Sequence, residues 1–265
     1  SAKFPGMQFE IIAVKAMGDK NLNKPLAELG GRGVFVKELE DALLDRRVDF
    51  VVHSLKDLPT ESIAGLELAA TLNRADPRDV FVSKGNLKFA DLPAGSKIAT
   101  SSRRRAAQLS VARKDLVFTD IRGNIQTRLK KHDDGACDAM VLAAAGLLRM
   151  GLDQRIAEYF DYDFCIPAVG QGALAIECRS DDENVLDVLS DINEALVWDC
   201  IQAERAFLNT IGGGCSVPVG AIARIIEGDK IELVACVASV DGSRILRDTA
   251  CGARSDAKSL GVQVA

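Results

Sequence analysis

Histidine is scarce in this 265-residue sequence, and its two copies, His53 and His132, leave little room for histidine-based metal sites or catalytic triads. The sequence has no Cys-x-x-Cys pair, no signal-peptide pattern and no apolar run of membrane-spanning length. Its formal net charge of -5 at pH 7 argues against a general nucleic-acid binder. We therefore expect no metal, no nucleic-acid partner and no membrane, and any basic cluster must be a local binding site.

Seven cysteines are an odd number, which does not suit a complete disulfide framework. Cys137, Cys178, Cys200 and Cys236 lie inside apolar runs, so we expect them to be reduced core residues of a cytoplasmic protein. A composition of 48% hydrophobic and 27% charged residues is typical of a globular protein, and the length allows two or three domains.

Strand-like and helix-like segments alternate along much of the chain, which predicts an α/β fold. We expect strands at residues 9–14, 49–53, 66–71, 97–100, 116–119, 138–142 and 174–178. We expect helices at residues 36–45, 102–112, 123–132, 144–150 and 194–211.

The sequence also indicates how these segments are grouped. The run at 49–53 is continuously β-branched or aromatic, which is typical of a parallel sheet, and 174–178 is expected to return to the same sheet. The polar segment 73–79 is expected to cross between two domains. Beyond residue 194, the pattern predicts an antiparallel hairpin of 230–240 and 244–251, and therefore a smaller α+β domain.

Lys56 and Asp57 directly follow the strand expected at 49–53. In open α/β sheets the carboxyl ends of strands face the ligand-binding crevice, so this pair is a candidate site. The alternative is a local turn in which the aspartate binds its own backbone before Pro59 ends the segment.

Three consecutive arginines, Arg103 to Arg105, open the helix expected at 102–112. Ser101 or Ser102 is a suitable N-cap, but the helix dipole already places about half a positive charge at this end. The arrangement therefore predicts a bound carboxylate or phosphate, and a ligand with several acidic groups is implied. Similar arginines follow at Arg122, Arg128 and Arg149. The alternative is that all of these side chains are exposed and solvated.

Cys215 lies in a glycine-rich loop, Gly-Gly-Gly-Cys-Ser-Val-Pro at 212–218, after the helix expected at 194–211. Consecutive glycines disfavour helix and strand, and they allow a bulky group to approach the main chain closely. We therefore expect Cys215 to be accessible. The alternative is a helix cap followed by a connector with an incidental thiol.

Five motifs together resemble the hydroxymethylbilane synthase family, whose members are also called porphobilinogen deaminases. They are Val-His-Ser-Leu-Lys-Asp-Leu-Pro at 52–59, Thr-Ser-Ser-Arg-Arg-Arg at 100–105, Ile-Arg-Gly-Asn at 121–124, Ala-Val-Gly-Gln-Gly-Ala at 168–173 and Gly-Gly-Cys-Ser-Val-Pro at 213–218. The motifs occur in the family's order and cover essentially the whole chain.

The resemblance implies two α/β domains related to periplasmic binding proteins, joined by two crossovers, and a small α+β C-terminal domain. On this basis residues 1–73 and 173–190 form the first domain, 78–166 the second and 195–265 the third. Family members begin with a strand and helix whose Arg and Ser pattern contacts substrate, and this sequence starts after that pattern. Its end likewise falls where the family continues into a last helix.

The resemblance also implies the reaction. Family members join four porphobilinogen units, with loss of ammonia, onto a dipyrromethane primer and release linear hydroxymethylbilane. Asp57 would stabilise the azafulvenium cation that forms in each step. Cys215 would hold the dipyrromethane cofactor through a thioether. A cytoplasmic monomer that needs no metal is expected.

Further contacts are carried over from the family residue by residue. The expected cofactor contacts are Ser54, Lys56, Asp57, Thr100, Ser102, Arg104, Arg105 and Gly172. The expected substrate contacts are Arg32, Arg122, Arg128, Arg149 and Gln171. Relatives often carry an apolar residue in place of Arg103, so no contact is assigned to it.

Two other functions fit parts of the sequence. A two-lobed module would clamp an anionic metabolite without chemistry, but such a binder needs neither an accessible thiol nor an acid that faces arginines. Another cysteine-dependent transferase is also conceivable, but no histidine or lysine lies beside Cys215 in the sequence to activate its thiol.

Overall fold

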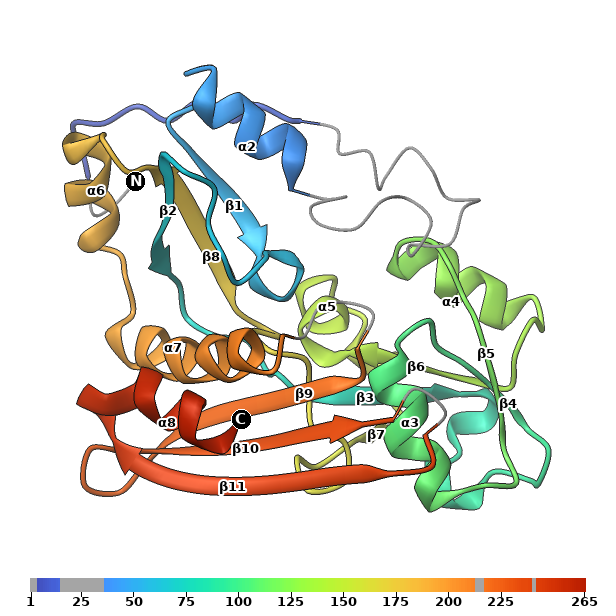
Figure 1. The fold of residues 1–265 in the computed structure, drawn as a ribbon. Coiled ribbons are helices and arrows are strands. Elements are labelled where there is room, and N and C mark those ends of the chain that lie inside the picture. Colours follow the sequence, from blue (N-terminus) through green and yellow to red (C-terminus); the bar gives the residue numbers. More distant parts are fainter. Residues whose placement is uncertain (1–3, 15–35, 213–216, 240–241) are drawn as a thin grey trace.

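The computed structural model describes residues 4–14, 36–212, 217–239 and 242–265. Within these ranges the strands form three sheets, each flanked by helices (Figure 1). The prediction of a mixed α/β fold is therefore confirmed. Of the helices in this part of the chain, none is both long and apolar enough to cross a membrane.

The first sheet has three antiparallel strands in the order β1-β8-β2. Two helices pack against it through small apolar clusters. The elements are β1 (Phe50–Ser54), β2 (Leu66–Thr71), β8 (Leu174–Arg179), α2 (Lys37–Leu44) and α6 (Glu183–Ser190). The predicted strands at 49–53 and 66–71 and the return of 174–178 to this sheet are confirmed, whereas α6 was not predicted.

The prediction that β1 belongs to a parallel sheet is wrong, because β1 pairs antiparallel with β8. Its side chains alternate in burial: Val51 and His53 are buried, while Val52 is 49% exposed. Antiparallel sheets commonly have one covered and one solvated face, and an exposed valine in the middle of the strand is consistent with that.

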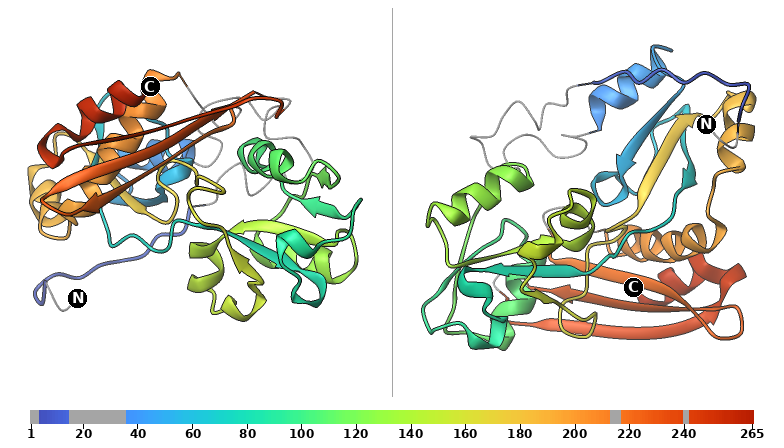
Figure 2. Two further views of the ribbon diagram at one scale, coloured as in Figure 1. Left: turned by 90° about the horizontal axis from the view of Figure 1, so that it is seen from below. Right: turned by 180° about the vertical axis from the view of Figure 1, so that it is seen from behind.

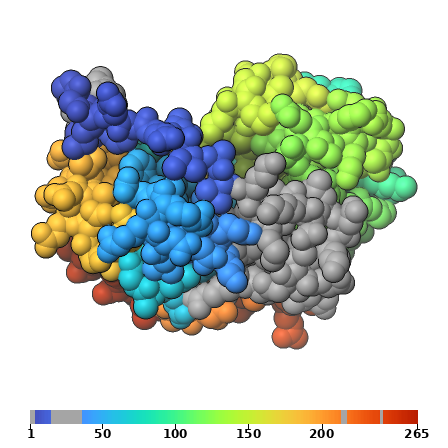
Figure 3. Space-filling view, turned by 90° about the horizontal axis from the view of Figure 1, so that it is seen from above, coloured from blue at the N-terminus to red at the C-terminus, as the bar shows by residue number. Residues whose placement is uncertain are grey.

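Residues 9–14 do not form a strand, so this prediction is also wrong. Phe9, Ile11 and Ile12 are 47%, 95% and 52% exposed, and the segment, dark blue in Figure 3, lies on the surface. An apolar run becomes a strand only where a neighbouring strand completes its hydrogen bonds. None of the described strands pairs with residues 9–14.

The second sheet has the order β5-β4-β6-β3-β7. Strand β4 is parallel to β5 and β6, whereas β3 is antiparallel to β6 and β7. The strands are β3 (Asp79–Ser83), β4 (Lys97–Ala99), β5 (Val117–Thr119), β6 (Ala139–Ala143) and β7 (Glu158–Tyr159). The helices are α3 (Arg103–Ala112), α4 (Ile125–Asp133) and α5 (Ala144–Arg149). The alternation predicted between residues 97 and 150 is confirmed, but β3 and β7 were not predicted.

The third sheet is antiparallel, in the order β11-β10-β9, and two helices pack on one of its faces (Figure 2). Phe207 and Leu260 from these helices meet Leu233 in one core. The elements are α7 (Ala195–Thr210), β9 (Val219–Ile226), β10 (Lys230–Ala238), β11 (Ile245–Ala253) and α8 (Ala257–Val264). The predicted long helix and hairpin are confirmed, and β9 and α8 were not predicted.

Two crossovers connect the first and second sheets and run side by side. The amide of Ala75 in one donates to the carbonyl oxygen of Gly172 in the other at 3.1 Å. Gly172 has φ +86°, and a Cβ at this position would collide with the carbonyl oxygen of Ala75. Only glycine therefore fits this close approach.

A fully buried carboxylate, Glu204 on α7, ties both crossovers to the third sheet. It accepts hydrogen bonds from Arg74 Nη1 and Nη2 at 2.6 and 3.1 Å. It also accepts from the amides of Gly170 at 2.7 Å and Ala223 at 2.8 Å. With this number of donors, the carboxylate is well compensated for its complete loss of hydration.

Candidate active site

A short 3-10 turn, η2 (Leu55–Asp57), follows β1 and carries the Lys56–Asp57 pair. Leu55 and Leu58 are buried in one apolar cluster, and the Leu55 amide donates to the carbonyl oxygen of Ala173 at 3.1 Å. Because both leucines turn inward, Lys56 and Asp57 face outward and are exposed. The pair therefore lies at the end of β1, where the sequence predicts it.

Lys56 and Asp57 are exposed at the surface, but the protein atoms around them still reduce the hydration of both charged groups. Burial lowers the pKa of Lys56; the charge of Asp57 opposes this shift, and the charges of Arg105 and Arg104 increase it. Burial also raises the pKa of Asp57, although the charges of Lys56 and His53 oppose that shift. Because the charges of Arg104 and Arg105 act on Lys56, the end of β1 and the first turn of α3 belong to one site.

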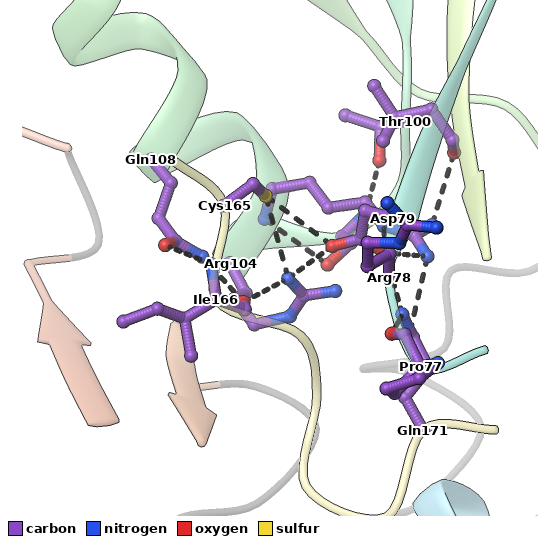
Figure 4. A network of polar contacts seen from close by, with 12 residues as sticks. Pro77, Arg78, Asp79, Thr100, Arg104, Gln108, Cys165, Ile166 and Gln171 are labelled. Carbon is purple, nitrogen blue, oxygen red and sulfur yellow. Dashed lines mark hydrogen bonds and ion pairs between the residues drawn. The ribbon is translucent and has the colours of Figure 1, made fainter. Parts of the chain in front are cut away.

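Arg104, at the start of α3, points to Asp79, the first residue of β3 (Figure 4). Arg105, the next residue of the helix, binds the same carboxylate. Arg104 Nη1 donates to Asp79 Oδ2 at 2.6 Å. Arg105 donates from Nε and Nη2 to Asp79 Oδ1 at 2.9 and 2.7 Å. Asp79 is 0% exposed, and the two arginines are 5% and 7% exposed. For these two residues, the alternative of exposed and solvated arginines is therefore wrong.

Part of the negative charge that the arginine cluster requires therefore comes from a residue of the protein, Asp79. Burial alone would raise the pKa of Asp79, but the charges and hydrogen bonds of Arg104 and Arg105 outweigh it and hold the pKa well below its usual range. Gln171 completes the network, because its Nε2 donates to the Pro77 carbonyl oxygen at 2.7 Å and to Asp79 Oδ1 at 2.9 Å. These side chains have a structural role, and their direct contacts with cofactor or substrate stay predictions.

The hydroxyl groups of this region organise the same turn. Ser102 is the N-cap of α3, and its Oγ accepts from the Arg105 amide at 3.4 Å, which confirms one of the two predicted caps. Thr100 is buried, and its Oγ1 accepts from the Ser102 amide at 3.2 Å. Ser54 is exposed at the end of β1.

A second basic group surrounds Arg128 on α4. Burial lowers the pKa of Arg128, and the charges of Arg105 and Arg122 lower it further. Its Nε donates to the carbonyl oxygen of Gly123 at 2.6 Å, which holds the side chain against the start of the helix. Positive charges therefore repel one another across this region, and a ligand with several carboxylates would relieve the repulsion. The residues concerned are Lys56, Arg105, Arg122 and Arg128.

Among the surface recesses of the described residues, two lie near basic side chains, and one of these two contains predicted site residues. The recess of about 340 Å³ is lined by Arg122 and Lys131 beside Ile121. The other, of about 440 Å³, lies around Arg254 between α7 and α8 and contains none of the predicted contacts. The residues that line the two recesses, rather than their volumes, therefore favour the one beside Arg122.

Other predicted residues are placed as follows. Arg149 Nη2 donates to the Gly172 carbonyl oxygen at 3.0 Å, so both lie at the crossover. Arg32 and Cys215 lie outside the described residues. Cys137, Cys178, Cys200 and Cys236 are free and buried, which confirms the prediction that they are core residues.

Three further polar groups of the site were not predicted: Asp79, the His53–Glu177 pair and Arg205. His53 Nε2 lies 3.1 Å from Glu177 Oε2, and both side chains are buried between β1 and β8. Had 50–54 been assigned to an antiparallel strand with one covered face, the period of two would have placed His53 on the same face as Val51. Nothing in the sequence pattern links it to Glu177, which is 124 residues away.

Comparison with known proteins gives two matching family models. The model described as "Porphobilinogen deaminase, dipyromethane cofactor binding domain" matches residues 2–187. The model described as "Porphobilinogen deaminase, C-terminal domain" matches residues 198–265.

Curated relatives agree with these models. The porphobilinogen deaminase of Trichlorobacter lovleyi is 47% identical over 264 residues, which cover 100% of this chain and 84% of the relative. That of Bacillus cereus is 48% identical over 259 residues, covering 97% of this chain and 83% of the relative. Among solved structures, the methionine-binding protein MetQ has a TM-score of 0.41 and 14% identity, over 60% of this chain and 74% of that chain. The models and the relatives favour an enzyme over a binding module, and the chain belongs to the porphobilinogen deaminase family.

Proposed function

We propose that Asp57 is the catalytic carboxylate of this family member. The chain is a transferase that joins four porphobilinogen units, with loss of ammonia, onto a dipyrromethane primer and releases linear hydroxymethylbilane. The observation that carries the assignment is the position of Asp57: its carboxylate is exposed at the end of β1, beside Lys56, on which the charges of the α3 arginines act. A binder of anions would gain nothing from an acid in that place.

The basic residues fit a dipyrromethane cofactor, because its acetate and propionate arms are carboxylates. Lys56 and Arg128 repel nearby arginines and are partly desolvated, so a carboxylate placed among them would form strong charge-assisted hydrogen bonds. We infer that Lys56, Arg122 and Arg128 hold the acidic arms directly. The buried Arg104 and Arg105 add positive electrostatic potential to the site. When bound through Cys215, the cofactor supplies the free pyrrole carbon to which the first substrate unit is joined.

The remaining predicted contacts complete the proposed site. Ser54, Thr100, Ser102, Gly172, Arg149 and Gln171 lie at the ends of β1 and β4 or at the crossovers. We propose that those with accessible polar atoms give neutral or secondary contacts, and that Arg32 binds substrate.

Asp57 acts where charge develops in the reaction. As ammonia leaves the aminomethyl group, positive charge spreads over the pyrrole ring of the substrate. The Asp57 carboxylate accepts a hydrogen bond from the pyrrole N–H and stabilises that charge, as a preorganised group in a desolvated site does. Lys56 assists, because its charge opposes the rise that burial causes in the pKa of Asp57 and so favours the ionised form.

Asp57→Asn tests this role, since it keeps the shape of the side chain and removes its charge. In single-turnover chain elongation by cofactor-loaded protein, we expect the rate to fall roughly a hundredfold, about 3 kcal/mol. Substrate affinity should change little, because ground-state porphobilinogen carries little of the ring charge. Asp57→Glu should retain more activity than Asp57→Asn.

Asp91→Asn is the matched control, because Asp91 is an exposed aspartate in another turn of the second sheet's domain. It should elongate at the rate of the unmodified chain. Near-normal elongation by Asp57→Asn would leave Asp57 as a turn residue before Pro59.

We also propose that the three sheets lie in three domains, formed by residues 1–73 with 173–190, 78–166 and 195–265. The protein would act as a monomer in the cytoplasm. Free, buried cysteines such as Cys178 and Cys200 suit a reducing compartment. Light scattering that gives the mass of two chains would contradict the monomer.

A further inference from the structure

Arg205, on α7, donates hydrogen bonds to three successive carbonyl oxygens just after the catalytic turn. Its Nη1 reaches Leu58 at 3.5 Å, and its Nη2 reaches Pro59 at 2.7 Å and Thr60 at 3.0 Å. One helical turn further along α7, Asn209 Oδ1 accepts from Thr60 Oγ1 at 3.1 Å. Residues four apart share a helix face, so one face of α7 holds the segment that leaves Asp57.

The three carbonyl groups need a donor from outside their own segment. The turn η2 ends at Asp57, its C-cap Leu58 is extended with φ -86° and ψ 126°, and Pro59 prevents the helix from continuing. Their oxygens therefore have no amide four residues ahead to bond, as they would in a helix. A planar guanidinium with several N–H groups suits this task better than a single ammonium group.

Arg205 also interacts with the interior of the first sheet. Burial lowers the pKa of Arg205, and the negative charge of Glu177 opposes that shift. Glu177 in turn lies 3.1 Å from His53, whose charge acts on Asp57. The turn is thus held at its start by the hydrogen bond from the Leu55 amide to Ala173, and just after its end by Arg205 of α7.

The hydrogen bonds of Arg205 connect the segment after Asp57 to the helix that precedes Cys215 in the sequence. Asp57 lies one residue before Leu58, and α7 continues in the sequence through Gly212 toward Cys215. We propose that Arg205 is a positioning residue that holds the Asp57 turn in register with the helix leading to Cys215. The proposal rests on the catalytic role of Asp57 proposed above.

Arg205→Lys keeps the charge but leaves one ammonium group to serve three carbonyl groups. We expect single-turnover elongation to slow about ten- to a hundredfold, since a displacement near 1 Å has effects of that size. The KM for porphobilinogen should stay within about threefold, because the basic residues that hold the acidic arms are unchanged. Arg224→Lys is the matched control: Arg224 lies on β9 in an exposed ion pair with Glu232, and its loss should leave elongation unchanged.

A double-mutant cycle separates positioning from general structural support. If Arg205 acts through Asp57, the double variant Asp57→Asn/Arg205→Lys should be no slower than Asp57→Asn alone. If the two effects multiply, Arg205 does not act through Asp57 and the inference is overturned. If Arg205→Lys fails to fold, Asn209→Ala, which removes only the bond from Thr60, must show the same non-additivity on a smaller scale, and additivity there overturns the inference as well.

The same measurements distinguish this inference from the proposed function. Normal elongation by Asp57→Asn would overturn the catalytic assignment. Slow elongation by Asp57→Asn together with normal elongation by Arg205→Lys would overturn the positioning role of Arg205 alone.

Discussion

Asp79 and Arg105 form a buried ion pair in which Nε and Nη2 of the arginine both reach Oδ1, at 2.9 and 2.7 Å. Arg104 occupies the other carboxylate oxygen at 2.6 Å. Asp79 opens β3 at the end of one crossover, and Gln171 joins it from the other crossover. The ion pair therefore lies where the two crossovers meet the base of the basic cluster.

Asp79→Asn should destabilise the protein strongly, because it leaves two buried guanidinium groups without their counter-charge. Removal of one partner of a buried ion pair typically costs about 3–5 kcal/mol. Urea unfolding followed by circular dichroism would measure this loss. Asp181→Asn is the control, since Asp181 pairs with Arg46 on the surface, with both side chains more than 60% exposed at 66% and 64%.

The control should change the free energy of unfolding by less than about 1 kcal/mol. The Asp79 effect should also depend on pH. Because the pKa of Asp79 is lowered in the folded protein, its contribution is present in full above the ordinary aspartate value of 3.8 and is lost progressively as pH falls from there through the lower pKa of the folded state. Equal stability of Asp79→Asn and the unmodified chain at pH 7 would show that the two arginines have another counter-charge.

Lys56→Gln should move the acidic limb of the pH–rate profile to higher pH. Burial already raises the pKa of Asp57, and the charge of Lys56 opposes that shift. Its removal should raise the pKa of Asp57 further, because an opposite charge close to a carboxylate favours its ionised form. In the proposed mechanism the ionised carboxylate of Asp57 is the active form, so the rate should fall at a higher pH than before.

The rate of single-turnover elongation should be measured between acidic and neutral pH. The quantity to compare is the pH at which the rate falls, because a lost cofactor contact would lower the rate at every pH. Lys230→Gln, an exposed lysine at the start of β10, should leave the limb in place. A limb that stays fixed in Lys56→Gln would mean that another group controls the acidic side.

Cys215 should carry the covalent cofactor, because its glycine-rich loop allows a bulky group to approach the main chain. The intact mass of active protein should exceed that of the sequence by a two-pyrrole adduct, and Cys215→Ser should lack it. Cys251→Ser is the control, since Cys251 is a free and exposed thiol. Peptide mapping that finds the adduct on Cys251 or Cys178 would refute the assignment.

Local patterns were sufficient for most helices and strands and for the place of the Lys56–Asp57 pair. Helical spacing marked α7, the serine before the arginines marked the N-cap of α3, and the strand–turn boundary marked the end of β1. These features depend on interactions within a few residues, such as the hydrogen bond from the Arg105 amide to Ser102, so they are visible in the sequence. The family motifs are likewise short and contiguous.

Long-range partners were not visible in any of these patterns. An anion was predicted beside the arginines of α3, but whether it is a ligand or Asp79, 26 residues before Arg105, depends on how β3 enters the second sheet. The direction of β1 and the unpaired state of 9–14 were decided by which strands lie next to them. Arg205 reaches Pro59 across 146 residues. Such contacts form only when packing brings distant segments together, because a side chain's charge and shape specify the kind of partner and topology specifies which one.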